Sequence, residues 1–506
     1  MRPTSSVKNI TASLLLAGLC HAVYATPSIT EVTVTGSDGK RYVITYTQTS
    51  FGASATQLRA LPWWGNSTLA DSLASASGEL TGVNTGSADI GCCTSSYAGP
   101  VFAYTEDGGS VWGTFLHNSH THSGEDPIPD DVAIYYALGR LALNVQQSST
   151  NQSNNPALNA ATIIDATPNL QALFNDLSTD QEISAAASQT LPLLTGGSMA
   201  AAGNALSGIN KVIQARIESN RGLSAGDGFF GDKYVWVKPF GSWADQDDQQ
   251  GVSGFKSTTT GVAFGVDSAV NDKLRLGTAM AYAKADVDSN SNVAKQSADV
   301  DVFQLVGYGS YSLGNNSEVN FQVDVGQNSN KGRRSIAFTN STATSEYTSY
   351  TAHAGAGLGR TYQLSAATSI TPSIRADYTW IKDKAYQESG AGLLNLNVGS
   401  RDSEEFVLGL DGKISHQLSD NTSLSANLGV GYDTMAKRSS ITATFAGAPG
   451  AAFTTYGLDA EPWSARAGVG LTHTTANGTE ITLRYDAEHR EAFLNQTASL
   501  KARWAF

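Results

Sequence analysis

Three histidines lie close together in the N-terminal part of the chain. His117, His120 and His122 fall within six residues and are followed by Glu125 and Asp126. Imidazole nitrogens and carboxylate oxygens bind zinc and copper, so this cluster is a candidate metal site. The alternative is a solvated loop rich in Ser and Gly, because histidines on a flexible tract hold metal weakly without supporting hydrogen bonds. We expect no other bound cofactor.

A pair of adjacent cysteines, Cys92 and Cys93, lies in the same region. Consecutive Cα atoms are about 3.8 Å apart, which is shorter than the usual separation in a disulfide, so a bond between them would be strained. Two buried thiols are the alternative. We assign the pair no catalytic role.

Ser198 is a candidate nucleophile, because Gly196-Gly-Ser-Met-Ala200 resembles the nucleophile segment of subtilisin-like proteases. That chemistry also requires a His base and an orienting Asp, and the preceding region has no His-Gly-Thr segment. A His-Glu-x-x-His pattern is absent too. The simpler interpretation is that Ser198 begins a helix as its N-cap.

Length, charge and targeting limit the class of protein. A chain of 506 residues suggests two or three domains, and its net charge of -13 argues against binding nucleic acid. Arg2 and Lys8 precede an apolar stretch, and Val23-Tyr24-Ala25 offers small residues for cleavage. We therefore predict a secretory signal peptide over residues 1–25.

The chain from Lys233 to Phe506 alternates between apolar and polar residues. In the segment 480–490, Ile481, Leu483, Tyr485 and Ala487 alternate with Thr482, Arg484, Asp486 and Glu488. A soluble sandwich and a membrane barrel both use such strands. Strands longer than about 5–6 residues, tight turns that alternate with long connections, and a chain that stops on Phe506 favour the barrel.

We predict about twelve antiparallel strands, an even number that suits a closed bacterial barrel. Their approximate centres are Val237, Phe264, Ala279, Leu305, Val323, Gly355, Ile374, Leu408, Leu428, Val469, Leu483 and Leu500.

Several motifs in this part resemble the autotransporter barrel family of type V secretion. They are Tyr234-Val-Trp-Val-Lys-Pro-Phe-Gly-Ser-Trp243, Gly261-Val-Ala-Phe-Gly-Val-Asp267, Phe445-Ala-Gly-Ala-Pro-Gly-Ala-Ala-Phe453, Arg466-Ala-Gly-Val-Gly-Leu471, Arg484-Tyr-Asp486 and Trp504-Ala-Phe506. The resemblance implies an outer-membrane β-barrel of a Gram-negative bacterium, with a helix threaded through the lumen. It also implies that Trp504 and Phe506 form the barrel-insertion signal. The implied partners are outer-membrane lipid, periplasmic chaperones and the outer-membrane insertion machinery.

The segment 198–222 is the candidate lumen helix. Ser198 to Ser219 is rich in Ala, has no internal Pro, and would span about 33 Å at 1.5 Å per residue. Ser198 would cap it, and Lys211 and Arg216 would meet acids of the lumen such as Asp324 or Asp486. The alternative is an amphipathic helix packed on a soluble domain.

Residues 26–147 are predicted to form a small α+β passenger domain, followed by a linker with helical pieces at 148–197. A hairpin joins the alternating segments 29–35 and 41–48 around Asp38-Gly39, and helices are expected at 67–76 and 131–145. Short strands are expected at 101–104 and 111–116. The repeated units of a long β-solenoid are absent from this sequence.

The sequence therefore predicts a barrel, at 233–506, that anchors and exports its own N-terminal passenger to the cell surface. The passenger is interpreted as a binding or interaction module of unknown ligand and not as an enzyme. Some relatives cut themselves between paired asparagines inside the lumen helix, whereas Asn154-Asn155 precedes it here, so we expect an uncleaved product. A surface hydrolase or metal-dependent enzyme on the same barrel, and a plugged porin-like barrel, are the alternatives.

Overall fold

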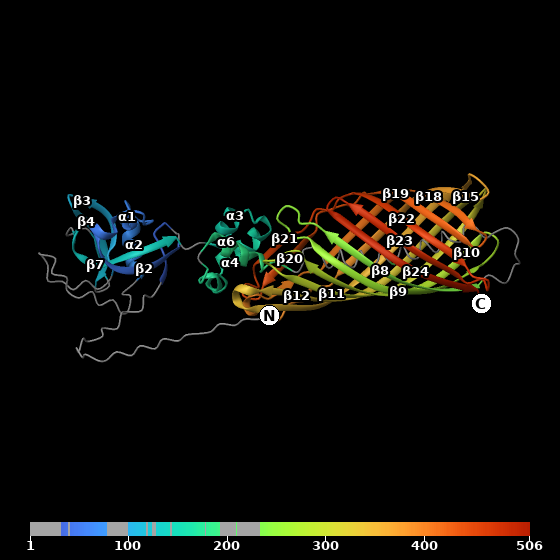
Figure 1. Cartoon of the computed structure of the whole chain (residues 1–506). Helices are drawn as coiled ribbons and strands as arrows, with labels where there is room; N and C mark the ends of the chain where they lie inside the picture. Colours follow the sequence, from blue (N-terminus) through green and yellow to red (C-terminus); the bar gives the residue numbers. More distant parts are fainter. Residues whose placement is uncertain are drawn as a thin grey trace, which may run out of the picture. The chain divides into compact units, whose positions relative to one another are not determined.

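The computed structural model describes residues 32–38, 41–77, 100–117, 120–123, 128–141, 144–177, 179–192, 209 and 233–505. The chain divides into two compact units, Met1–Ala142 and Leu143–Phe506. Each unit is described below by itself (Figure 1). Within these ranges, none of the helices combines the length and apolarity needed to cross a bilayer.

The first unit is a small α+β domain, as predicted. One sheet has the order β1-β2-β7, and the second has the order β3-β4-β5 with β6 paired to β4. Its elements are β1 (Val32–Thr35), β2 (Arg41–Ser50), α1 (Phe51–Arg59), α2 (Ser67–Ser77), β3 (Phe102–Asp107), β4 (Ser110–His117), β5 (His120–Ser123), β6 (Ile128–Pro129) and β7 (Ala133–Leu141). Its buried core includes Ile44, Leu58, Trp63, Leu73 and Tyr136.

The helix predicted for residues 131–145 is wrong. The chain there forms β7, which pairs antiparallel with β2 from Ser50 opposite Ala133 to Tyr42 opposite Leu141. Ile134 and Tyr136 are buried while Ala133 is exposed and Tyr135 half-buried, which is the two-residue period of a strand. Leu138 and Leu141 happen to repeat Ile134 at helical spacing, and the long pairing with β2 overrides that signal.

Twelve long strands of the second unit form a closed antiparallel barrel, which confirms the predicted architecture. Each predicted strand centre falls within one of them. They are β8 (Lys233–Gln246), β9 (Phe255–Ala269), β10 (Leu274–Ser289), β11 (Gln296–Gly314), β12 (Ser317–Ile336), β13 (Ser341–Arg360), β15 (Thr368–Asp383), β18 (Arg401–Ser419), β19 (Thr422–Asp433), β22 (Trp463–Thr474), β23 (Glu480–Arg490) and β24 (Phe493–Ala505).

The ring closes because β24 pairs with β8 and β13 pairs with β15. The two-residue strand β14 (Tyr362–Gln363) extends the sheet beside β15. Closure leaves none of the twelve strands with an unpaired edge, which a lipid environment requires because no water is present to bind free backbone groups.

The two ends of the barrel differ. Tight turns join β9 to β10, β11 to β12, β18 to β19 and β22 to β23, and Lys233 and Ala505 lie at the same end. The opposite end carries long connections, such as the one from β15 to β18. In outer-membrane barrels the short turns face the periplasm and the long loops face outward.

A helical and sheet body, which we call the cap, lies at the long-connection end (Figure 1). It contains α3 (Val145–Asn151), η1 (Asn155–Ala157), α4 (Leu158–Ala166), α5 (Pro168–Gln171), η2 (Ala172–Phe174), α6 (Asp180–Ser188), η3 (Ala337–Thr339), β16 (Tyr386–Gln387), η4 (Gly392–Leu394), β17 (Leu396–Val398), β20 (Ser440–Phe445) and β21 (Ala452–Tyr456). Helices α4, α5 and α6 lie within the segment 148–197, where helical pieces were expected, whereas α3 begins at Val145, within the range predicted for the passenger. The four short strands form one sheet in the order β16-β17-β20-β21.

Candidate functional site

The outer face of the barrel is apolar and exposed. Leu428 is 71% exposed, Val325 59% and Leu483 58%, although a soluble protein would bury most such side chains. Alternation places the polar residues between them on the other face of each strand. A contiguous apolar outer surface of this kind is what contact with acyl chains requires.

One wall of the lumen is also apolar. Apolar inward residues of β8–β11 form a buried cluster together with Ile209, although polar residues such as Lys238 and Thr259 are buried on the same strands. On β10 these inward residues are small and regularly spaced: Ala279, Ala281, Ala283 and Ala285. Trp236 and Tyr308 lie in the same wall, nearer the tight-turn end of the barrel. The indole Nε1 of Trp236 donates to the Tyr308 hydroxyl at 2.7 Å.

The adjoining part of the wall, on β12, β13 and β15, is polar, and its charges are paired. The imidazole of His353 lies between Asp324 and Asp377, at 2.7 Å and 3.0 Å. Arg375 contacts Asp377 at 2.7 Å and donates to the Asn320 side-chain oxygen at 2.7 Å. Because these charges are removed from bulk water, close pairing offsets part of the cost of desolvating them.

Similar pairs follow along β18–β24. Arg466 contacts Asp411 at 3.1 Å, and Arg484 contacts Asp486 at 2.7 Å. Asp324 and Asp486, the acids expected to receive Lys211 and Arg216, thus have partners within the barrel wall. Those two cations, and Ser198, are not among the described residues.

Ile209 is the described residue of the segment 198–222. Its side chain is fully buried within the apolar lumen wall. This apolar contact differs from the expectation for the segment, in which Lys211 and Arg216 meet acids of the lumen. The signal available in the sequence was the modest apolar stripe of Ile209, Val212 and Ile213, which favours the alternative of an amphipathic helix.

Of the two residues assigned to barrel insertion, Trp504 is described and Phe506 is not. Trp504 is 40% exposed and pairs with Val235 of β8. Nearby, on the inner face, Lys501 and Arg503 both contact Glu480, at 2.5 Å and 3.4 Å. The insertion role of Trp504 and Phe506 stays a prediction.

The candidate metal site lies on the β4–β5 hairpin of the first unit. In the backbone register His117 pairs with His120, and His122 pairs with Phe115. The side chains of the three histidines are not described, and neither are Cys92 and Cys93. Among the side chains that are, no group of three or more His, Cys, Asp or Glu is placed to hold a metal ion.

A closed ring with an apolar outer belt and a paired polar interior defines an integral outer-membrane β-barrel. A family model described as the autotransporter beta-domain matches residues 235–486. The barrel of this chain belongs to that autotransporter family, and the protein resides in the outer membrane of a Gram-negative bacterium.

Relatives of known name are outer-membrane proteins. Outer membrane protein A of Rickettsia conorii is 33% identical over 216 residues, which cover 40% of this chain and 10% of that protein. Outer membrane protein B of Rickettsia rickettsii is 27% identical over 198 residues, or 38% and 12% of the two chains. The match thus spans about a tenth of the length of these relatives.

Solved structures of similar fold include two from autotransporters. The translocator domain of NalP from Neisseria meningitidis is 18% identical with a TM-score of 0.48, over 60% of this chain and 98% of that one. The transport unit of AIDA-I from Escherichia coli is 11% identical with a TM-score of 0.39, over 59% and 98% of the two chains.

Proposed function

We propose that the barrel exports its own N-terminal passenger and keeps it anchored at the cell surface. The passenger is the first compact unit, up to Ala142, because α3, which lies partly within the predicted range 26–147, belongs to the cap. The passenger acts there as a binding or interaction module. It stays attached, because Asn154-Asn155 precedes the lumen segment and the Asn154 amide is bound to Ser184 and Ser188 within the cap.

The path of the chain through the barrel carries this proposal. Gln296 at the long-connection end donates to the carbonyl oxygens of Leu191 and Pro192, at 3.3 Å and 3.4 Å. Ile209 is enclosed by the lumen wall, and β8 begins with Lys233 at the tight-turn end. These three described points support a passage of the chain through the barrel during export, with the residues before Leu191 delivered to the outward side.

The self-contained core of the first unit supports its role as the exported domain. Its core is built from residues between Val34 and Ala137 and uses no barrel residue. A domain of this kind folds once its own segment is outside. Burial of apolar surface then favours the outward position of the chain.

Protease added to intact cells tests the export. Removal of the passenger, with a periplasmic marker protein left uncut, is the expected result. Full protection of the passenger on intact cells, together with digestion after the outer membrane is opened, would contradict surface display.

The metal site is tested separately. We propose that His117, His120 and His122 bind zinc or copper on the exported domain. Titration calorimetry of the passenger with zinc should give heat that disappears in a His120→Ala/His122→Ala variant. Heat no greater than the buffer background in the unaltered domain ends the metal proposal and leaves the export proposal standing.

A further inference from the structure

Two neighbouring barrel strands are much longer than a membrane crossing requires. β12 and β13 each contain 20 residues, whereas a tilted strand crosses the hydrocarbon core with about 9–11. Their hairpin, closed by η3, therefore extends beyond the bilayer at the long-connection end. The extra length places its tip among the elements of the cap (Figure 1).

The cap has one hydrophobic core built from two distant parts of the chain. The helical part contributes Val145, Ala157, Ala160, Ala161, Ile164, Leu170, Phe174, Ile183, Ala186 and Ala187. The barrel part contributes Ile336, Ala343, Tyr347, Tyr386, Ala391, Leu394, Leu396, Val398, Ile441, Ala443, Phe445 and Phe453. Phe174 packs against Phe338 of η3 with ring centroids 4.7 Å apart, so the two parts meet directly.

The helices of the cap are too short to be stable alone. α3 has 7 residues, and α4 and α6 have 9 each. Isolated helices shorter than about 12–15 residues are marginal in water, and most helical stability in proteins comes from packing an apolar face. α4 packs against β21 of the barrel extensions, whereas α6 packs against α3 and reaches the barrel side through its C-cap residue Gln189.

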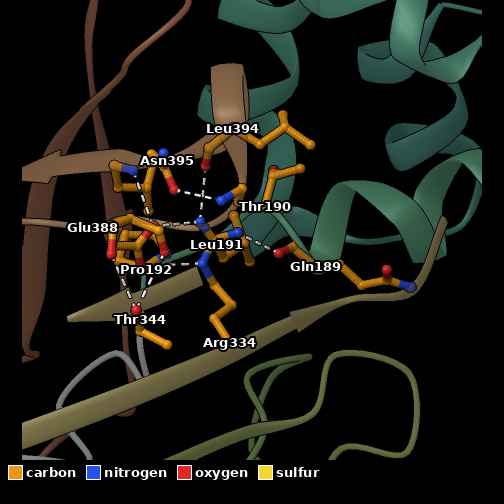
Figure 2. A network of polar contacts seen from close by, with 12 residues as sticks. Gln189, Thr190, Leu191, Pro192, Arg334, Thr344, Glu388, Leu394 and Asn395 are labelled. Carbon is orange, nitrogen blue, oxygen red and sulfur yellow. Dashed lines mark hydrogen bonds and ion pairs between the residues drawn. The ribbon is translucent and has the colours of Figure 1, made fainter. Parts of the chain in front are cut away.

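A buried arginine joins the two parts (Figure 2). The Arg334 side chain, near the end of β12, is fully buried, and its Nη1 donates to the carbonyl oxygen of Gln189 at 2.6 Å. Gln189 is the C-cap of α6. A cation at this position is favourable because it binds an unpaired carbonyl and faces the negative end of the helix dipole.

Glu388 holds the guanidinium in place from the barrel side. Its carboxylate accepts hydrogen bonds from Nε of Arg334 at 3.2 Å and from Nη2 at 2.5 Å. It also accepts one from the backbone N–H of Leu396 at 2.9 Å. Nη2 donates in addition to the Leu394 carbonyl at 2.8 Å. β12, the β15–β18 connection and α6 therefore meet at one buried ion pair, as Figure 2 shows.

We propose that the outward barrel extensions template the folding of residues 144–192, and that Arg334 locks this segment as a latch at the outer mouth. The inference rests on the proposed export. Before export the segment lacks half of its core and stays extended. After it emerges, it docks on the β12–β13 hairpin and on the β16-β17-β20-β21 sheet, which prevents the chain from sliding back through the lumen.

The test is hydrogen exchange of the full-length protein purified in detergent micelles, with Arg334→Met compared with Arg438→Met. Arg438 forms a half-exposed pair with Asp459 at 3.5 Å in the same outer region and serves as the matched control. Amides of α4 and α6 should exchange at least about tenfold faster in Arg334→Met, because removing one partner of a buried ion pair leaves the other uncompensated. The Arg438→Met variant should change them less than twofold.

Phe174→Ala provides a second route, since it weakens the same interface from the helical side and leaves every barrel residue intact. It too should accelerate exchange in α4 and α6 while the lumen strands keep their protection. Unchanged exchange in Arg334→Met and in Phe174→Ala would overturn the latch. Loss of passenger display on intact cells of the unaltered strain would instead contradict export, and the two failures are therefore distinguishable.

Discussion

The passenger and the cap are both small bodies with buried cores, yet they obtain those cores in different ways. The passenger core comes from one stretch of chain, Val34 to Ala137. The cap core combines Val145–Ala187 with barrel residues from Ile336 onward. A domain of the first kind can fold wherever its own segment is released, because its core needs no other part of the chain. A body of the second kind forms only beside its own barrel.

The largest expected difference appears when the two segments are produced alone. Residues 26–142 should give a cooperative thermal transition, because their core is complete. Residues 144–192 should give the circular dichroism of an unfolded chain, because their helices are short and their packing partner is missing. A stably helical 144–192 peptide would remove the distinction between the two bodies.

Core truncations should separate the two bodies within the intact protein. Leu58→Ala in the passenger and Ile164→Ala in the cap each remove a fully buried side chain. Each should cost about 2–5 kcal/mol in its own body. Thermal unfolding should show a lowered passenger transition only for Leu58→Ala, and faster exchange in α4 and α6 only for Ile164→Ala.

Gln57→Ala, at an exposed position beside Leu58, is the matched control for the passenger. It should change stability by no more than about 0.5 kcal/mol. A lowered passenger transition in Ile164→Ala would show that the two cores are coupled.

A charge on the lipid-facing surface should affect the cap but not the passenger. Leu428→Arg places a cation at a position 71% exposed to lipid and should destabilise the barrel by about 2–4 kcal/mol if the site lies near the bilayer midplane. Because the cap is built on barrel strands, its protection should fall as well. The temperature at which the barrel changes its mobility in gel electrophoresis measures barrel stability, and hydrogen exchange in α6 measures protection of the cap. The control Leu428→Ile should change neither.

Alkaline pH should give the smallest difference in stability between the passenger and the cap. Burial and the Asp38 carboxylate, 2.7 Å from the hydroxyl, raise the pKa of Tyr42 to about 12. The stability that this phenol contributes is complete below its unfolded pKa of about 10 and is lost as the pH rises through 12. Tyr42→Phe should therefore reduce the fall in the passenger melting temperature across this range, with no change in cap exchange.

The barrel was predictable because each strand faces lipid on one side. Val323 and Val325 alternate with Gln322 and Asp324 because successive side chains of a strand point to opposite faces, and this alternation is visible in a short stretch of sequence. β7 was mistaken for a helix because Leu138 and Leu141 fit both periods, and only the distant strand β2 decides between them. The helix α1 was missed, although Ser50 caps it by accepting from the Ala53 N–H.

The latch could not be predicted, because its contacts connect residues far apart in the sequence. Arg334 is 145 positions from Gln189 and 54 from Glu388. In sequence it looks like another inward polar residue of a barrel strand. The 20-residue length of β12, twice a bilayer crossing, was the available sign that its end lies outside the membrane.

The row of alanines on the inner face of β10 has a consequence for the speed of transit. Methyl groups offer a sliding polypeptide no donor or acceptor, so its backbone amides find no deep resting point along Ala279–Ala285. Under the proposed export we expect friction along this row to be low, and a polar residue introduced there, such as Ala283→Asn, to slow the passage of the chain.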